Sequence, residues 1–566
     1  MLDLIIRGGS LIDGTGAPGR TADVGVAGGR VVAVGAIDDA AAQVVDADGA
    51  LVTPGFVDIH THYDGQATWD TTLQPSSGHG VTTIVMGNCG VGFAPVRESD
   101  HAQLIELMEG VEDIPGAALH EGLPWDWHSI ADYLDALERR PHDIDFCAQV
   151  CHGPLRLYVM GQRGADREPA TAEEIAEMGR IAAEGVRAGA LGFTTSRTLN
   201  HRTSRGEPTP TLTAARDELV GIARALGDAG AGVMQVVSDW PDFDDESGTL
   251  LEMMRVSRRP LSVSLSAARG YSHRRILDLL VAANDEGLRM RAQVPARGIG
   301  VLIGLQATVN PLMGSETFRS LGAPPLSELV AVLCDPDVKA RVVADVAEHP
   351  GGRTMGILDR VFELGDPPNY EPGPEDSVEA RAARLGTNPV ELLYDLMLGD
   401  DGRALLYWPI LNYADGNLDA AAELMAHQYT VPGLSDGGAH VGTICDASFP
   451  TTLLSYWARD RDHGTTFTPE WVVQRQCRAT AEAVGLLDRG IVAPGYKADL
   501  NVIDFEHLGM GAPRLVFDLP AGGKRLVQPS SGYLHTFVNG VEVCRDGVST
   551  GATPGHLVRG AQRQPA

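Results

Sequence analysis

Short apolar segments alternate with longer amphipathic segments through the middle of the chain. Each apolar segment ends in polar or small residues and is usually followed by a helical pattern, which is the alternation expected of parallel βα units. Eight strands are predicted in this way, at residues 55–60, 81–86, 146–151, 190–194, 232–237, 261–265, 289–294 and 430–435. Eight such units predict an α/β fold, a TIM-like (β/α)8 barrel, whose chemistry belongs on the loops at the C-terminal ends of the strands.

One helix between these strands can be delimited from its own residues. It runs from Thr171 to about Arg187, with Thr171 as its N-cap and Glu174 three residues later. At this spacing each side chain can accept a hydrogen bond from the backbone NH of the other residue. Acidic residues in the first turn are also stabilised by the positive end of the helix dipole. The sequence therefore predicts a helix over this range.

The same pattern divides the chain into two parts and an insertion. Near both ends, short β-branched strands are separated by glycine-containing turns, and Asn539-Gly540 is a strong hairpin signal. We therefore expect residues 1–54 and 488–566 to build one β-domain beside a barrel of residues 55–487. The stretch 302–428 is too long for a simple βα connection, so it is predicted to be an insertion with helices of its own.

Composition excludes several kinds of partner. The chain has 45 Lys and Arg residues against 75 Asp and Glu residues, a formal charge of -30, which repels nucleic acid and anionic membrane surfaces. No window reaches the roughly 20 apolar residues of a membrane-spanning helix, and the N-terminal residues lack a basic export signal. The cysteines are sparse and lack CxxC spacing, which is typical of a reducing cytoplasm. We expect a cytoplasmic protein with a small-molecule substrate, and homo-oligomerisation stays open.

Two histidines directly follow the first predicted strand. His60 and His62 are two residues apart on an extended segment, so their imidazoles point the same way, as chelation of one metal ion requires. A His-x-His pair alone is a weak signal, and a hydrogen-bonded structural pair is the alternative. Its position at the mouth of the first barrel strand favours a metal site.

Two further residues end strands of the same predicted barrel. Asp436 ends the eighth strand, which barrel closure brings beside the first, so its carboxylate could bind the metal and move a proton; a turn aspartate is the alternative because Asp-Gly-Gly also favours turns. Cys89 ends the second strand within Gly-Asn-Cys-Gly, and its thiolate suits a borderline-soft ion such as Zn²⁺. The alternative for Cys89 is a small buried apolar residue.

Four other polar residues at strand ends are candidates for binding substrate. Arginine suits a substrate carboxylate because its guanidinium makes two parallel hydrogen bonds. Histidines in such places are more often structural than functional. The candidates are His152, Arg197, His201 and Arg297.

Four segments in this order resemble the amidohydrolase superfamily, specifically its N-acyl-D-amino-acid deacylase branch. They are residues 55–62, 87–90, 435–437 and 490–500, and the resemblance covers nearly the whole chain. It implies a TIM-like barrel with a small β-sandwich domain formed from both termini. It also implies metal-assisted hydrolysis of an amide, a C–N bond other than a peptide bond, in an N-acyl amino acid or related small amide.

The chain departs from that branch on the middle strands. Members usually have further metal-binding histidines there, whereas residues 234–239 and 263–268 contain none. No lysine precedes Lys339, so a carboxylated-lysine bridge on a middle strand is excluded. The preferred hypothesis is therefore one divalent ion, rather than two, bound by His60, His62 and Asp436 with Cys89.

In this hypothesis Asp436 is the general base and then the general acid. Two alternatives use the same residues. One is hydrolysis of a lactone, ester or carbamate, and the other is a degenerate, non-catalytic ligand-binding member of the superfamily.

Overall fold

Every one of the eight predicted segments contains a strand. The computed structural model describes residues 1–268, 273–348 and 356–565. The strands are β6 (Phe56–Asp58), β7 (Val81–Met86), β8 (Asp145–Ala148) with β9 (Val150–Cys151), β10 (Gly192–Arg197), β11 (Val233–Ser238), β12 (Leu261–Ser264), β13 (Met290–Val294) and β17 (Thr430–Pro432). The third predicted segment is interrupted at Gln149 and so contains two short strands.

These strands form two parallel sheets. One has the order β6-β7-β8, and the other has the order β17-β13-β12-β11-β10-β9. A parallel bridge joins Thr61, just after β6, to Gly437, just after β17. Every residue of β7 is buried, as expected of a parallel strand covered on both faces. The fold is therefore α/β, and the ends of its first and last parallel strands lie side by side.

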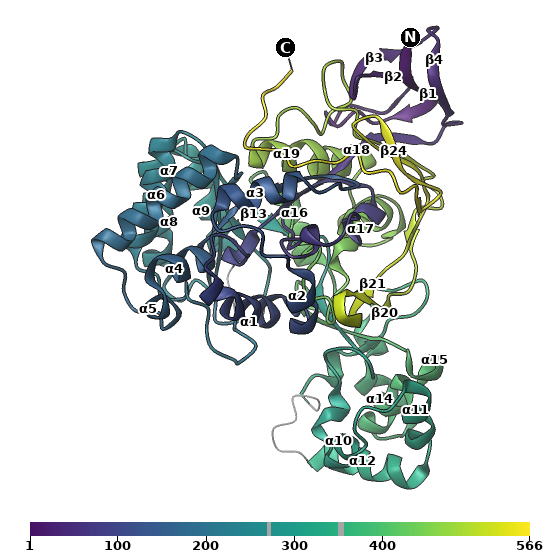
Figure 1. Ribbon diagram of the computed structural model, residues 1–566. Coiled ribbons are helices and arrows are strands. Elements are labelled where there is room, and N and C mark those ends of the chain that lie inside the picture. Colours follow the sequence, from purple (N-terminus) through teal and green to yellow (C-terminus); the bar gives the residue numbers. More distant parts are fainter. Residues whose placement is uncertain (269–272, 349–355, 566) are drawn as a thin grey trace.

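Helices cover the parallel sheets, and three consecutive ones, α6, α7 and α8, pack side by side (Figure 1). The predicted helix is α6, in which Thr171 Oγ1 accepts from the Glu174 backbone NH at 3.2 Å and the Glu174 carboxylate accepts from the Thr171 NH at 2.7 Å. No helix of the described residues is long and apolar enough to cross a membrane. The helices of this part are α1 (His101–Glu112), α2 (Gly116–Gly122), α3 (Ile130–Glu138), α4 (His152–Met160), α5 (Gln162–Ala165), α6 (Ala172–Ala188), α7 (Arg216–Ala229), α8 (Phe243–Ser257), α9 (His273–Asp285), α16 (Asp419–Ala426), α17 (Phe449–Ser455), α18 (Pro469–Val473) and α19 (Thr480–Val484).

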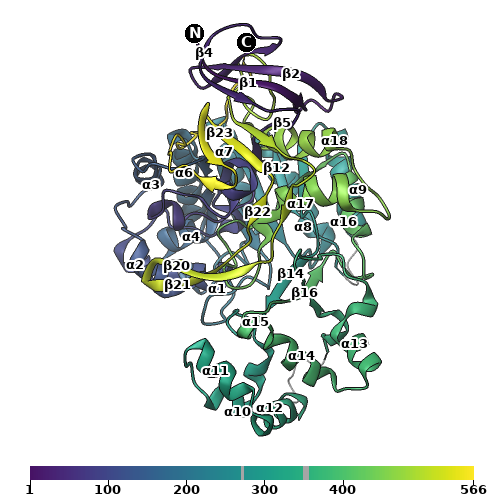
Figure 2. The same cartoon turned by 90° about the vertical axis from the view of Figure 1, so that its right-hand side faces the viewer.

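Both ends of the chain enter one mixed, nine-stranded sheet. Its order is β25-β24-β23-β18-β5-β1-β2-β3, with β4 paired to β1. The ends are joined where β5 pairs antiparallel with β18, and both termini lie at the same end of the molecule (Figure 2). The strands are β1 (Leu2–Leu11), β2 (Arg20–Ala27), β3 (Arg30–Gly35), β4 (Ala41–Asp46), β5 (Leu51–Pro54), β18 (Leu500–Ile503), β23 (Tyr533–Val538), β24 (Val541–Arg545) and β25 (Val548–Ser549).

One hairpin of the C-terminal segment lies away from this sheet. Strands β20 (Arg514–Leu519) and β21 (Gly523–Val527) pair only with each other and pack near α2. Arg525 of β21 donates to the carbonyl of Gln74 at 3.1 Å. The C-terminal residues therefore contact the loop that follows β6, in addition to building the terminal sheet.

A helical lobe with a core of its own lies between β14 (Ile299–Ile303) and β16 (Leu406–Leu411), and it projects from the rest of the molecule (Figure 1). Its core includes Phe318, Leu333, Val342 and Leu393. Residues 418–425, which the predicted insertion included, instead pack into the main core. The elements of the lobe are α10 (Glu316–Ser320), α11 (Leu326–Leu333), α12 (Pro336–Glu348), β15 (Phe362–Glu363), α13 (Val378–Leu385), α14 (Pro389–Met397) and α15 (Gly399–Gly402).

Candidate metal centre

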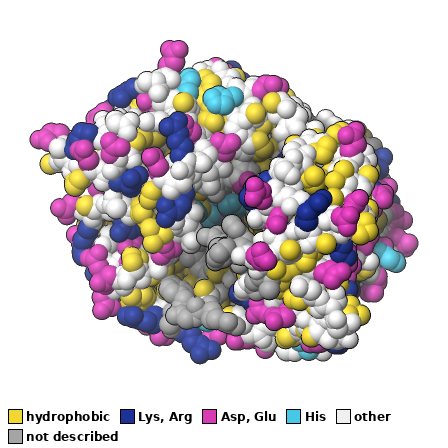
Figure 3. All heavy atoms as spheres, turned by 90° about the horizontal axis from the view of Figure 1, so that it is seen from below, with side chains coloured by type: hydrophobic (Ala, Val, Ile, Leu, Met, Phe, Trp, Pro, Cys, Tyr) yellow, Lys and Arg dark blue, Asp and Glu magenta, His cyan; other side chains and the backbone are white. Residues whose placement is uncertain are grey.

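A cavity of about 480 Å³ lies at the C-terminal ends of the parallel strands. In a view from below, a hollow lies near the centre of the face, and histidine atoms lie inside it (Figure 3). The cavity is lined by His60, His62, Cys89, Val111, Glu112, Thr198, Asn200, His201, Val237, Ser238, Asp239, Trp240, Ser264, Leu265, Ser266, Ala268, Ile299, Ile410, Leu411, Leu434, Asp436 and His440.

The four predicted metal-binding residues converge on one wall of this cavity. His60 Nε2 lies 3.3 Å from Cys89 Sγ and 3.4 Å from Asp436 Oδ1. His62 Nε2 lies 3.7 Å from the same Asp436 oxygen. The ligand atoms of His60, His62 and Cys89 all lie within 4.8 Å of one another. His60, His62 and Cys89 therefore form one compact group of nitrogen and sulfur donors, and Asp436 adds an oxygen beside the two histidines.

Local backbone geometry aims these side chains. Thr61 points away from the cavity, and its hydroxyl donates to the Val85 carbonyl at 2.9 Å, so the flanking histidines face the same side. Cys89 and Asp436 have φ angles of 55° and 49°, in the left-handed region that non-glycine residues rarely occupy. Such strain persists only where the surroundings enforce it, and it is concentrated at functional sites.

Amide side chains of β11 and β13 lie beside the candidate ligands, and Gln235 of β11 falls within residues 234–239, where the family's histidine is missing. Gln293 Oε1 lies 2.5 Å from His60 Nδ1, and an amide oxygen only accepts, so this contact places the His60 proton on Nδ1 and leaves Nε2 free of a proton. Gln235 Oε1 accepts from the Cys89 backbone NH at 3.0 Å, and its Nε2 donates to Ser264 Oγ at 3.2 Å. These amides orient the candidate ligands.

Burial sets the protonation of the site. It lowers the pKa of His60 to about 4, so the imidazole is neutral at pH 7. Burial alone would raise the pKa of Asp436, but contact with His62 and the nearby His60 hold that pKa well below its usual range. Burial, with Glu112 and Asp436 nearby, raises the pKa of Cys89, so a metal ion binding there would displace the thiol proton.

Glu112 is a buried acid at this site that the sequence analysis missed. It ends α1, is 1% exposed, and places Oε1 3.2 Å from His62 Nδ1 and Oε2 3.6 Å from His440 Nε2. Burial raises its pKa well above the usual value. The single signal in the sequence is an acid in the last turn of a helix, where the dipole disfavours negative charge.

Replacement of Glu112 tests its role as a positioning residue for His62. Glu112 Oε1 and His62 Nδ1 are 3.2 Å apart without forming a hydrogen bond, so the proposed role requires this contact to become one when the metal binds. Loss of a carboxylate that orients a metal-bound histidine in this way typically lowers metal affinity about 10- to 100-fold. We expect Glu112→Gln to weaken zinc affinity by that factor in competition titrations. Glu106→Gln, on the same helix at the Arg205 pair, is the matched control. Equal affinity of both variants would contradict this role.

Of the four predicted substrate-binding residues, only His201 lines the cavity. His152 begins α4 directly after β9, so no loop projects it, and its Nε2 lies 2.8 Å from the buried Glu218. Arg197 donates to both carboxylate oxygens of Glu246, at 2.8 and 3.1 Å. Arg297 is fully buried, forms an ion pair with Asp446 at 3.2 Å and stacks over the Tyr370 ring.

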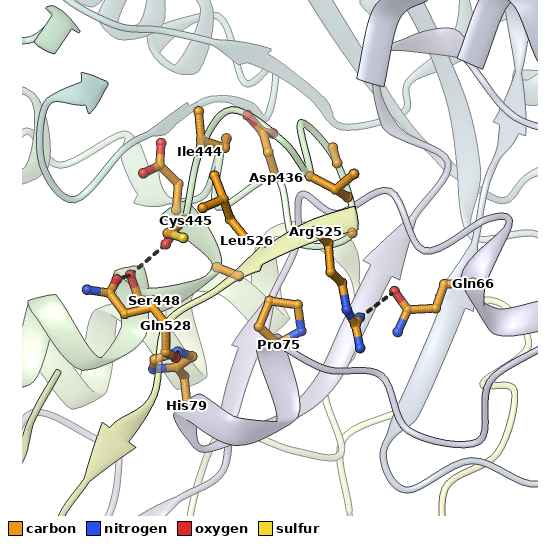
Figure 4. Close-up of a pocket in the computed structure, with 15 residues that line it drawn as sticks. Gln66, Pro75, His79, Asp436, Ile444, Cys445, Ser448, Arg525, Leu526 and Gln528 are labelled. Atoms are coloured by element: carbon orange, nitrogen blue, oxygen red, sulfur yellow. Dashed lines mark hydrogen bonds between the residues drawn. The ribbon is translucent and has the colours of Figure 1, made fainter. Parts of the chain in front are cut away.

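A second cavity, of about 20 Å³, lies behind the Asp436 loop and is closed by the β20–β21 hairpin (Figure 4). Its volume is that of about one water molecule. Arg525 of the hairpin donates to Gln66 Oε1 at 3.4 Å, as drawn in Figure 4, and pairs with Asp518 at 2.8 Å. Leu526 of the hairpin donates its backbone NH to the Val441 carbonyl, so the hairpin packs against the segment that follows Asp436, and Asp436 lines both cavities.

The α/β fold and a cluster of metal-binding residue types at its strand ends define the class of this protein. The chain belongs to the amidohydrolase family, whose model matches residues 43–544, and this confirms the family indicated by the sequence. It is 29% identical to a D-aminoacylase of Alcaligenes xylosoxydans xylosoxydans, over 98% of this chain and 97% of that protein.

Two further relatives support the D-aminoacylase-like branch. An N-acyl-D-glutamate deacylase of the same organism is 28% identical, over 96% of this chain and 93% of its own length. A solved D-aminoacylase structure, described as having a binuclear metal center with one-metal activation and second-metal attenuation, matches with a TM-score of 0.66 and 25% identity. That match covers 99% of this chain and 100% of the other.

Proposed function

We propose that this amidohydrolase uses the larger cavity to hydrolyse the amide bond of a small N-acyl compound with one metal ion bound by His60, His62, Cys89 and Asp436. The observation that supports this most directly is the convergence of these four side chains at the strand ends. We further infer that the two parallel sheets close into one TIM-like barrel, because the Thr61–Gly437 bridge links its first and last strands. We also propose that the nine-stranded sheet formed by the two ends of the chain is part of a β-sandwich domain.

The donor set fits a divalent ion. A tetrahedral zinc site with bonds of about 2.0–2.3 Å has ligand atoms about 3.3–3.8 Å apart. The separations from His60 Nε2 to Cys89 Sγ and to Asp436 Oδ1 are 3.3 and 3.4 Å. The mixture of imidazole, thiolate and carboxylate favours Zn²⁺ over the harder Mg²⁺ or Ca²⁺.

The middle strands favour one ion over two. They present Gln235, Ser264 and Gln293 near the cluster, and neutral amides and a hydroxyl are poor ligands for zinc. The amide oxygens are already engaged by the His60 ring and the Cys89 backbone NH. The relative described with one-metal activation is consistent with this proposal.

A bound divalent ion supplies Lewis-acid polarisation and lowers the pKa of a water from 15.7 to about 7. Asp436 accepts the proton of the attacking water, because its carboxylate lines the cavity and lies beside both histidines. The water oxygen then bonds to the acyl carbon, the C–N bond breaks, and Asp436 returns the proton to the departing nitrogen. The products are a carboxylic acid and an amine.

Metal analysis with a substrate panel tests this proposal. We expect about one zinc ion per chain, loss of turnover on chelation, and recovery on adding back one equivalent of Zn²⁺. The panel pairs N-acyl amines with the corresponding esters, lactones and carbamates, so the bond that is cleaved fastest identifies the reaction. Two ions per chain would contradict the single-ion site, and full activity after chelation would contradict metal dependence.

A further inference from the structure

A further cavity, lined by Arg289, Arg291 and Arg475 and named here the arginine cavity, has a volume of about 200 Å³. Its lining includes the first two residues of β11, β12 and β17 and the two arginines that flank Met290, the first residue of β13. These strands run parallel and pair as neighbours. The arginine cavity therefore lies at the starts of the strands, whereas the proposed metal ligands follow strand ends.

A helical segment forms another part of the cavity wall. It consists of a π-helical turn, η10 (Gln474–Ala479), followed directly by α19. Arg475, Ala479 and Ala483 line the cavity at intervals of four residues, which places them on one face of the helix. π-helical turns are rare and occur frequently at functional sites. The irregular turn in this segment thus coincides with residues that line the cavity.

The cavity has an excess of positive charge. Its charged lining residues are the three arginines and Glu482, so two positive charges are uncompensated there, in a chain whose formal charge is -30. The Glu482 carboxylate already accepts from Arg478 Nε at 2.7 Å. Arg291 donates to the amide oxygen of Asn284 at 3.0 Å, and this contact fixes the guanidinium without neutralising it.

Arg475 is anchored by one of its terminal nitrogens. Its Nη2 donates to the carbonyls of Met425 and His427, both at 3.2 Å, and to that of Thr430. Its guanidinium carbon lies over the Trp471 ring, 5.4 Å from the centroid. Its Nε is buried and forms no hydrogen bond with any described residue. Buried donors are nearly always satisfied, so this NH indicates a missing acceptor at the cavity.

The arginines of the cavity repel one another. Burial, with the nearby charge of Arg291, lowers the pKa of Arg475 to about 10. Burial also lowers the pKa of Arg291, and the charge of Arg289 acts in the same direction. Arg259, beyond the lining, is affected in the same way by burial and by Arg289. All four guanidinium groups stay charged at pH 7, so an anion placed among them would relieve this repulsion.

We propose that the arginine cavity binds a small dianion of the phosphate class, either inorganic phosphate or the phosphate group of a small ester. A phosphate group has a charge of about -1.5 to -2 at pH 7 and three strong acceptor oxygens, which matches the two uncompensated positive charges. Guanidinium groups also bind such oxygens with two parallel hydrogen bonds. This site is separate from the proposed hydrolysis, because it lies at the other end of the strands.

Calorimetric titration tests the proposal. Inorganic phosphate and glycerol 3-phosphate are titrated separately into the zinc-loaded protein at pH 7.5, after removal of excess metal and at constant ionic strength set with chloride. We expect one binding site per chain outside the metal centre, with a dissociation constant of about 1 mM or lower for at least one of the two probes. Tighter binding of the ester identifies a phosphate ester as the ligand, and equal or weaker binding identifies free phosphate. Failure of both probes to bind would overturn the proposal.

Arginine variants locate the bound anion, because phosphate also binds to zinc. We expect Arg475→Gln to weaken phosphate binding about tenfold or more, since it removes a charged donor. Arg289→Gln changes an exposed residue, so it keeps the proposal testable if Arg475→Gln does not fold, and we expect it to weaken binding about threefold or more.

Arg341→Gln, an exposed arginine on α12 of the helical lobe, is the matched control and should leave phosphate affinity unchanged. The thermal midpoint of each variant without phosphate shows whether it is folded. Wild-type phosphate affinity in folded Arg475→Gln and Arg289→Gln would place the anion at the metal centre and overturn the proposal. An equal loss of affinity in Arg341→Gln would do the same, because it would show a general charge effect.

Discussion

Replacement of Asp436 by asparagine is expected to lower kcat by about 10² to 10⁴, the range that general acid and base catalysis contributes. The amide keeps an oxygen for the metal but cannot accept the proton of the attacking water. The measurement is turnover of the best amide of the panel at saturating Zn²⁺, with bound metal quantified in the same sample.

The same measurement separates proton transfer from metal binding. We expect Asp436→Asn to retain at least half of its zinc under saturating conditions. The matched control is Asp462→Asn, because Asp462 is an acid with 93% of its side chain exposed. Wild-type turnover in Asp436→Asn would exclude this carboxylate as the general base, whereas complete metal loss would assign it to metal binding alone.

Replacement of His60 by alanine is expected to reduce zinc affinity by more than 100-fold, beyond the range typical of residues that only support a ligand. His60 Nε2 lies within 3.4 Å of both Cys89 Sγ and Asp436 Oδ1, so its loss removes the central donor of the cluster. Activity should fall in proportion to bound metal, and high Zn²⁺ should restore part of it.

His120→Ala is the matched control for His60→Ala, since His120 is exposed on α2 and outside the cavity lining. Metal content should be measured by elemental analysis after dialysis, and the thermal midpoint should be recorded for both variants. Unchanged zinc stoichiometry in His60→Ala would contradict the proposed ligand set.

The parallel strands were predictable because strands covered on both faces read as short apolar runs. Their order along the chain also predicted that the residues after β6 and β17 would meet, which brings Asp436 beside His60 and His62. The helix at Thr171 was predictable because its capping residues are local. These parts of the fold and site depend on short-range patterns and on one regular topology.

Other parts depend on packing that has no local pattern. Glu112 reaches His62 from a helix in a different layer, so no spacing in the sequence links the two. His152 was correctly placed at a strand end, but the immediate start of α4 turns it into the core. Arg197 and Arg297 form ion pairs with buried acids from distant elements. Neither arginine lines the cavity, and no local pattern in the sequence indicates these pairs.

The pairing of β5 with β18 has a consequence for synthesis of the chain. Pro54 leaves the ribosome roughly 450 residues before its partner Leu500, which corresponds to about 22–90 s at elongation rates of about 5–20 residues per second. During that interval one edge of β5 has no strand to pair with, and open strand edges promote aggregation. The nascent N-terminal segment therefore exposes an unpaired strand edge until the last strands emerge.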